Sequence, residues 1–287
     1  MTATPGFDPS SLAANLVCGA DGIWRPDARD PVSSSARLSY PEEGNLNCLA
    51  LEEDSFWFEH RSACILTMVR RFPPPGALLD VGGGNGYVAL GLQKAGVAVG
   101  LLEPGEQGAR NAYRRGVRPV ICATLQEAGF APNALAGVGL FDVLEHIEDD
   151  AGFLATIAHL LTPGGRVYLT VPAYPLLWSA DDDYAGHYRR YTLAGLRRLL
   201  AGAGLAVDFA SYFFWMLPLP ILLMRAVPTR LGLRKPNAWA SYRQEHRSRP
   251  GLAGKLLNAL LRLELRRLQR KSGLPCGGSC LVVARKR

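Results

Sequence analysis

The chain has 287 residues, of which 48% are hydrophobic. This length and composition allow one large domain, or one domain with an appendage, and they exclude a chain too polar to build a core. The six cysteines are scattered without a CxxC pair, which argues against structural zinc and for free thiols in a reducing cytoplasm. Residues 1–11 have neither a basic flank nor a long apolar run, so no signal peptide is expected.

The net charge of +7 is unevenly distributed along the chain. Residues 225–287 contain 16 basic and two acidic residues, which leaves 16 basic and 23 acidic residues for the remainder. A basic C-terminal segment on an acidic body predicts an anionic partner, either a membrane surface or a nucleic acid.

The first 45 residues are polar and rich in Ser, Pro, Asp and Gly, which predicts a loop or a partly ordered arm. A helix is expected next, from Ser55 to Phe72, because apolar residues recur at helical spacing and three prolines follow. Its aromatic start, Phe56-Trp57-Phe58, is either a packed helix face or a lid over a bound cofactor. Both interpretations stay open, and Trp57 is a candidate substrate contact.

The segment from Leu78 to Tyr87 predicts a ligand site, because it combines a buried strand, a glycine turn and the start of a helix. The free N–H groups of a helix start carry partial positive charge, and glycines let a ligand approach the backbone. From Gly82 the spacing is G-x-G-x-G, and Tyr87 stands where a dinucleotide fingerprint has its third glycine. Asp80 precedes the turn, where a carboxylate would repel pyrophosphate but suits an ammonium or hydroxyl group.

This turn, Asp80-Val81-Gly82-Gly83-Gly84-Asn85-Gly86, resembles motif I of the class I S-adenosylmethionine-dependent methyltransferases, D-x-G-x-G-x-G. The resemblance implies S-adenosylmethionine as the cofactor. It also implies that its methionine end is held by Asp80 and by the backbone at Gly82, Gly84 and Gly86. A glycine-rich turn of some other α/β protein is the alternative when this motif is taken alone.

A second buried strand, Val97–Leu102, ends at Glu103. A carboxylate at this position suits the two hydroxyl groups of a ribose, whereas elsewhere an acid just past a strand is often a helix cap. The distance from the glycine motif favours the ribose. A third strand is expected over Val117–Ala123, and Thr124 and Leu125 just beyond it would flank the adenine.

A fourth strand, Gly137–Phe141, leads into the run D-V-L-E-H-I, and a helix and the turn L-T-P-G-G precede a fifth strand, Arg166–Val171. This series resembles the motif IV to motif V region of the same methyltransferases, so the resemblance covers about residues 55–210. It implies a Rossmann-like α/β fold. The expected sheet has seven strands and is mostly parallel, with an antiparallel last strand and helices on both faces.

Three polar residues of this run, Asp142, Glu145 and His146, have the spacing i, i+3, i+4 and could share one helical face. Quinone-biosynthesis O-methyltransferases with a similar run are thought to hold a divalent metal there. The favoured interpretation has no metal: Asp142 caps the helix beside the cofactor, and Glu145 and His146 shape the cofactor end of the pocket.

The segment from Pro172 to Thr192 follows the fifth strand at the edge of the sheet where α/β proteins bind ligands. Its pattern L-W-S-x-x-D … G-H-x-R-R-Y resembles a bacterial methyltransferase subgroup of poorly defined substrate. The candidate general bases are His187 first and His146 second, since histidine titrates near neutrality, and Asp182 is a further catalytic candidate. The expected acceptor contacts are Tyr174, Trp178, Arg190 and Tyr191. An internal ion-pair cluster that only fixes the loop is the alternative.

An insertion separates the sixth strand, Leu205–Tyr212, from the last strand, Ser279–Arg285. It begins with an apolar run, which prolines and Arg225 interrupt. A membrane-spanning helix there would split the last two strands, so none is expected. A basic amphipathic helix follows over residues 252–271. It either lies on an anionic membrane or packs on the sheet edge with a solvated basic face. The apolar run favours the membrane surface or a lipid-like acceptor.

The predicted function is methyl transfer from S-adenosylmethionine to a small-molecule or lipid-like acceptor, with O- or N-methylation favoured over C-methylation. The expected units are an arm (1–45), a methyltransferase domain (46–212 and 274–287) and an apolar and basic helical insertion (213–273). One alternative is a cofactor-binding, membrane-associated module without methyl transfer. Nucleic-acid methylation is disfavoured because no N-P-P-Y motif follows the fourth strand. The expected location is cytoplasmic, with peripheral binding to the inner face of the membrane left open, and no oligomeric state is predicted.

Overall fold

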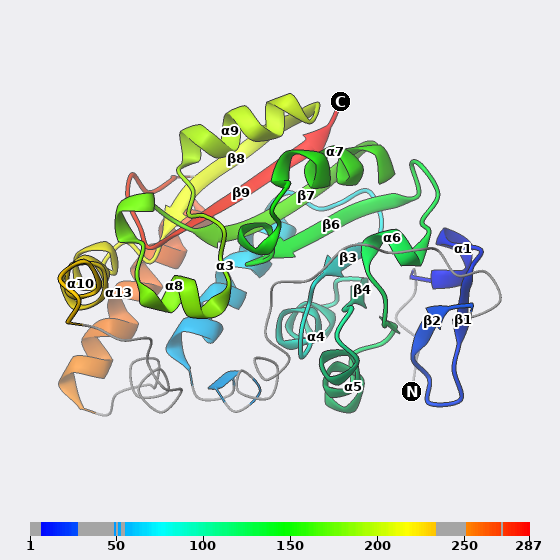
Figure 1. Ribbon diagram of the computed structural model, residues 1–287, viewed down its shortest axis with the longest axis horizontal. Coiled ribbons are helices and arrows are strands. Elements are labelled where there is room, and N and C mark those ends of the chain that lie inside the picture. Colours follow the sequence, from blue (N-terminus) through cyan, green and yellow to red (C-terminus); the bar gives the residue numbers. More distant parts are fainter. Residues whose placement is uncertain (1–6, 28–48, 50, 53–54, 234–250, 271) are drawn as a thin grey trace.

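A computed structural model describes residues 7–27, 49, 51–52, 55–233, 251–270 and 272–287 (Figure 1). In these parts of the chain one sheet has the strand order β1-β2-β5-β4-β3-β6-β7-β9-β8. The expected strands are all present: β3 (Leu78–Val81), β4 (Val99–Leu102), β5 (Val120–Ile121), β6 (Leu135–Phe141), β7 (Leu161–Pro172), β8 (Leu205–Phe213) and β9 (Ser279–Lys286).

The direction of the strands agrees with the prediction. Five neighbouring strands of the sheet, β5, β4, β3, β6 and β7, are parallel to one another. The strand β9 is antiparallel to both of its neighbours, β7 and β8. Parallel strands put their carboxyl ends at one edge of the sheet. Asp80 lies near the end of β3, and Glu103 and Asp142 directly follow β4 and β6, so all three are at the same edge. This edge is where a ligand site is expected.

The predicted number of seven strands is wrong, because a hairpin extends the sheet beyond β5. Its strands are β1 (Leu16–Cys18) and β2 (Trp24–Pro26), and β2 pairs with β5 where Trp24 faces Ile121. A short helix, α1 (Pro9–Leu12), precedes it. Strands of three residues are too short to show alternating hydrophobicity, so polar composition predicted a loop there. Residues 1–6 and 28–45 of the expected arm lie outside the described residues.

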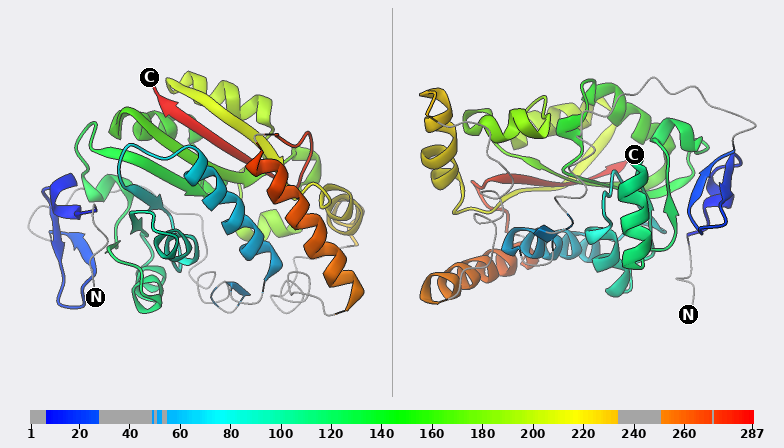
Figure 2. Two further views of the ribbon diagram at one scale, coloured as in Figure 1. Left: turned by 180° about the vertical axis from the view of Figure 1, so that it is seen from behind. Right: turned by 60° about the horizontal axis from the view of Figure 1, so that its bottom comes forward.

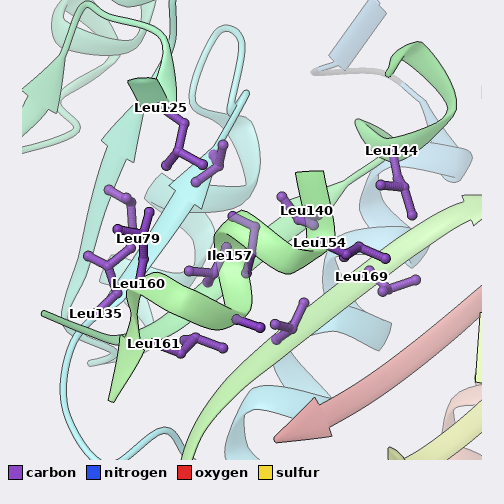
Figure 3. Close-up of a cluster of buried hydrophobic side chains, with 14 of the residues drawn as sticks. Leu79, Leu125, Leu135, Leu140, Leu144, Leu154, Ile157, Leu160, Leu161 and Leu169 are labelled. Atoms are coloured by element: carbon purple, nitrogen blue, oxygen red, sulfur yellow. The ribbon is translucent and has the colours of Figure 1, made fainter. Parts of the chain in front are cut away.

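Helices cover both faces of the sheet, as predicted (Figure 2). One face is covered by α3 (Phe56–Arg71), α4 (Tyr87–Lys94), α5 (Glu106–Arg115) and α13 (Leu252–Gln269). The other face is covered by α6 (Leu125–Ala128), α7 (Asp150–Leu160) and α9 (Leu193–Gly202). The strands supply both cores by alternation: Leu78 packs on the first side and Leu79 on the second. Figure 3 shows Leu154, Ile157 and Leu160 of α7 packed over the second side.

The expected insertion is helical where it is described. The segment 218–230 is one continuous rod made of α10 (Pro218–Ile221), a π-helical turn (Leu222–Ala226) and α11 (Val227–Arg230). The helix α13 packs along α3 (Figure 2), and residues 234–250 lie outside the described residues. None of the described helices is both long and apolar enough to cross a membrane.

A buried hydrogen-bond network joins the insertion to the rest of the fold. The carboxylate of Glu264 in α13 lies 2.7 Å from Nε2 of His60 in α3. It also accepts the backbone N–H groups of Phe214 and Trp215, each at 2.8 Å, just after β8. Because a buried carboxylate without such partners is costly, this network fixes α13 against α3.

Candidate active site

The glycine turn after β3 has a backbone that only glycine adopts without strain. Gly82, Gly84 and Gly86 all have positive φ, at 70°, 53° and 75°. A Cβ atom on Gly82 would lie 2.9 Å from a methyl group of Val143, so this glycine also lets the turn approach the segment after β6. The helix α4 then begins at Gly86 without a side-chain cap, which leaves its first N–H groups available to a ligand.

The carboxylate of Glu103 is fixed beside this turn. It accepts the N–H of Gly84 on one oxygen and the N–H of Gly105 on the other, both at 2.9 Å. A carboxylate has about four acceptor positions, and an ionised carboxylate is a strong acceptor for hydroxyl groups. The position fits the predicted ribose contact.

Asp80 is a buried carboxylate in an unusual setting. Its side chain is 1% exposed, and neither oxygen has a hydrogen-bond partner among the described residues. Burial raises its pKa to about 7, and the charge of Glu103 adds to this while Arg61 opposes it. A cationic group that enters the turn would compensate the buried charge, so the site fits the ammonium group of a methionine moiety.

The raised pKa of Asp80 predicts how stability depends on pH. Between the ordinary value of 3.8 and about 7, the folded chain holds the proton and the unfolded chain has lost it. The free energy of unfolding of the ligand-free protein should therefore fall with rising pH in this window. The Asp80 contribution is up to about 1.4 kcal/mol per pH unit. Urea unfolding at several pH values, compared with Asp80→Asn, measures this contribution, because other titrating groups remain in both proteins. Parallel pH profiles for the two would contradict it.

The structure corrects the role predicted for Asp142. A single 3₁₀ turn, η1 (Leu144–His146), follows β6, so Asp142 caps no helix and shares no helical face with Glu145. Its φ is 59°, its carboxylate forms an ion pair with Arg61, and it accepts a hydrogen bond from Thr170 at 3.0 Å. The local sequence signal predicted a cap because acids are common at helix starts, whereas the ion pair with α3 decides the conformation. Its predicted contact with the cofactor stays a prediction.

Arg61 is a site residue that the sequence analysis missed. It reaches from α3 to the carboxylate of Asp142, with its guanidinium carbon 4.8 Å from the centre of the Trp57 ring. Its Nε has no hydrogen-bond partner among the described residues. A carboxylate of a ligand would suit this cation. The signal in the sequence is its place one helical turn after Trp57, within the aromatic start of the helix.

A cluster of titratable side chains lies next to Asp142. Tyr188 donates its backbone N–H to the carbonyl of Glu145 at 2.8 Å, which brings the rings of His146 and His187 to 4.8 Å between centres. Glu145 is buried, its Oε2 has no described partner, and burial raises its pKa well above the usual range. Burial and the neighbouring His187 lower the pKa of His146 to about 3, which makes His146 a weak base.

The same cluster has the ligand types of a metal site. Ligand atoms of Glu145, His146 and His187 lie within 4.8 Å of one another, a donor set that suits a divalent ion. Asp142, which the metal interpretation of the sequence required, is instead occupied by Arg61 and Thr170. The expectation that no metal binds stays a prediction.

His187 is oriented by a second carboxylate. Its Nδ1 lies 3.0 Å from Asp182, which is buried at the start of the short helix α8 (Ala180–Ala185). Arg190 binds both oxygens of Asp182, at 2.7 and 2.9 Å. Although burial would raise the pKa of Asp182, its hydrogen bond with His187 and the charge of Arg190 lower it to about 2. Asp182 therefore remains ionised and positions His187.

The residues predicted to contact the acceptor all have partners within the protein. Tyr191 is buried and donates its hydroxyl hydrogen bond to Asp150 at 2.9 Å, and Arg190 is occupied by Asp182, so packing explains both side chains. Tyr174 has a φ of 57°, and its ring stacks on that of Tyr212 with 4.8 Å between the ring centres. Trp178 donates to Asp183 at 3.0 Å.

The predicted lid and adenine contacts also have partners within the protein. The ring of Trp57 stacks on that of Phe214, with 5.7 Å between the ring centres, and the guanidinium of Arg61 lies over the Trp57 ring. Thr124 caps α6, and Leu125 is buried in the core on the α7 side. Their predicted contacts with substrate and adenine stay predictions.

Comparison with known proteins agrees with this geometry. The sequence profile of a family described as a methyltransferase domain matches residues 57–208. The chain therefore belongs to this family, and the predicted membership of the class I S-adenosylmethionine-dependent methyltransferases is confirmed, with S-adenosylmethionine as the family's cofactor.

Individual relatives are distant. The ubiquinone biosynthesis O-methyltransferase of Caulobacter vibrioides is 31% identical over 100 residues, which cover 32% of this chain and 39% of that protein. A phosphoethanolamine N-methyltransferase of Haemonchus contortus, solved with S-adenosylmethionine, has a TM-score of 0.53 at 18% identity, covering 91% of this chain and 61% of that chain. A possible histamine N-methyltransferase of Thermotoga maritima has a TM-score of 0.54 at 14% identity, covering 86% and 100%. The match thus spans about two fifths of the curated relative's length, and the solved structures show the fold alone.

Proposed function

We propose that this chain transfers the methyl group of S-adenosylmethionine to an oxygen or nitrogen atom of a small-molecule or lipid-like acceptor. The observation that carries the proposal is the pair of Asp182 and His187 beside the turn that follows β6. That turn contacts the glycine motif through Val143 and Gly82. A histidine with a fixed orientation is therefore close to a cofactor site of the methyltransferase family.

Three charged side chains support binding of the cofactor's methionine and ribose ends. Asp80 would take the ammonium group and Arg61 the carboxylate, because atoms of both side chains have no hydrogen-bond partner among the described residues. Glu103 would take the ribose hydroxyls, because the N–H groups of Gly84 and Gly105 hold its carboxylate beside the glycine turn. The bound cofactor supplies a sulfonium whose methyl group is already activated. The protein's task is then to align the acceptor and to exclude water.

His187 would act as the general base where the acceptor must lose a proton. With Nδ1–H donated to Asp182, Nε2 is the nitrogen that accepts a proton. The charge of Asp182 stabilises the imidazolium that forms, and Arg190 keeps Asp182 in place. A hydroxyl acceptor, or an amine that arrives protonated, has such a proton to lose, and the relatives' names include an O- and an N-methyltransferase.

The test is a methyl-transfer assay with the full chain. Calorimetry first measures S-adenosylmethionine binding, and release of S-adenosylhomocysteine is then followed with panels of phenols and amines, each as water-soluble and long-chain forms. Catalytic release with a hydroxyl or amine acceptor is expected. Binding of the cofactor without release in any panel would instead identify a module that binds the cofactor without transferring the methyl group. Exclusive transfer to carbon would contradict O- or N-methylation.

A further inference from the structure

One end of the molecule exposes large apolar side chains that no described part of the protein covers. On the rod of residues 218–230 and just beyond it, Leu219, Leu223, Met224 and Leu231 are each more than half exposed. The first two are one helical turn apart, so they lie on one face, whereas Ala226 on the inner side is fully buried. A soluble surface rarely gathers so many adjacent leucines without a binding role.

The helix α13 exposes a second stripe at the same end. Figures 1 and 2 place α10 and α13 at the end of the molecule opposite the β1–β2 hairpin. Leu261, Glu264 and Leu268 are buried against α3, while Leu256 and Leu263, seven residues apart, are more than half exposed.

Basic residues flank these leucines on α13. The exposed positions of the helix carry Lys255, Arg262, Arg266 and Arg267, and the one acid of the helix, Glu264, is buried in its network with His60. All charges on the outward face of α13 are therefore positive, and they lie beside its two exposed leucines. Together with the apolar face of 218–230, it forms what we call the amphipathic end.

This combination selects one kind of partner. A nucleic acid would neutralise the cations but would leave the leucines in water, and a purely apolar protein surface would leave the cations unpaired. An anionic bilayer satisfies both, since headgroups attract Lys and Arg while leucines enter the boundary with the acyl chains. We propose that the amphipathic end docks on an anionic membrane surface. The inference does not depend on which acceptor the proposed function uses.

The experiment is flotation of the full chain with vesicles of phosphatidylcholine alone or mixed in equal amounts with phosphatidylglycerol. Strong binding to the anionic vesicles that weakens with salt is expected. Arg262→Gln with Arg266→Gln should lower the partition coefficient about 25-fold, at about 5-fold for each cation. Leu219→Ser with Leu223→Ser should lower it at least about 10-fold.

Matched controls come from exposed residues elsewhere. Arg197→Gln with Arg198→Gln on α9 and Val17→Ser on β1 should leave the partition coefficient within about 2-fold, because these residues lie outside the amphipathic end. Circular dichroism and cofactor binding, unchanged in all variants, separate loss of docking from loss of fold or of the proposed function.

Equal partition of the wild type into both vesicle types would overturn the proposal, and so would unchanged partition in both amphipathic-end variants. A wild-type dimer that does not bind vesicles and becomes monomeric in the leucine variant would overturn it as well. A salt-sensitive gel shift with RNA or DNA, combined with no flotation, would assign the cations to a nucleic acid and would also overturn it.

Discussion

The His187→Ala variant should turn over about 10² to 10⁴ times more slowly than the wild type, because a positioned general base contributes rate enhancement of this order. Its Kd for S-adenosylmethionine should stay within about 2-fold, since His187 contacts Asp182 and His146 rather than the glycine turn. Steady-state kinetics with an acceptor found in the panel, together with calorimetry, measures the two quantities separately.

Controls for this variant distinguish a base from a structural or metal-binding role. Tyr188→Phe changes the exposed neighbour of His187 and should leave kcat within about 2-fold. Turnover that disappears with a chelator and returns with a divalent ion would transfer the role of His187 to a metal site with Glu145 and His146. Unchanged kcat in His187→Ala would contradict the assignment of a base.

The second large effect is expected at the ribose contact. Glu103→Gln should weaken S-adenosylmethionine binding about 10- to 100-fold, because hydrogen bonds to a charged group contribute about 1.5–3 kcal/mol. The amide also points a donor at one of the two N–H groups, of Gly84 and Gly105, that the carboxylate accepts. Calorimetry with S-adenosylmethionine measures the loss of affinity.

Glu106→Gln is the matched control, because this acid stands three positions further along and pairs with Arg25 and Arg110 at the surface. Its affinity for the cofactor should equal that of the wild type. A Glu103→Gln protein that binds as tightly as this control would show that the ribose lies elsewhere.

The cofactor half of the site could be predicted because its parts are local in sequence. A buried strand, a glycine turn and a helix start follow one another from Leu78 to Tyr87, and Gly82, Gly84 and Gly86 of the motif all have positive φ. Glu103 follows the very next strand, so the parallel order of β3 and β4 brings it back to the same turn.

The acceptor half could be predicted only in part, because its geometry depends on contacts between distant segments. Arg61 and Asp142 pair across 81 positions, and nothing in the run after β6 indicates a partner on α3. In contrast, Asp182, His187 and Arg190 lie within one loop, so their spacing alone indicates either a catalytic site or an ion-pair cluster. The structure contains the ion-pair cluster, and the catalytic role of His187 stays a prediction.

The position of β9 between β7 and β8 affects how the chain can fold during synthesis. The outermost strand, β8, has β9 as its sheet neighbour, and the ribosome makes β9 only after the whole insertion. At a synthesis rate of about 5–20 residues per second, several seconds pass between the synthesis of β8 and that of its partner β9. During this interval its edge can pair with other chains, so a nascent protein is expected to be most prone to aggregation just before its last strand emerges.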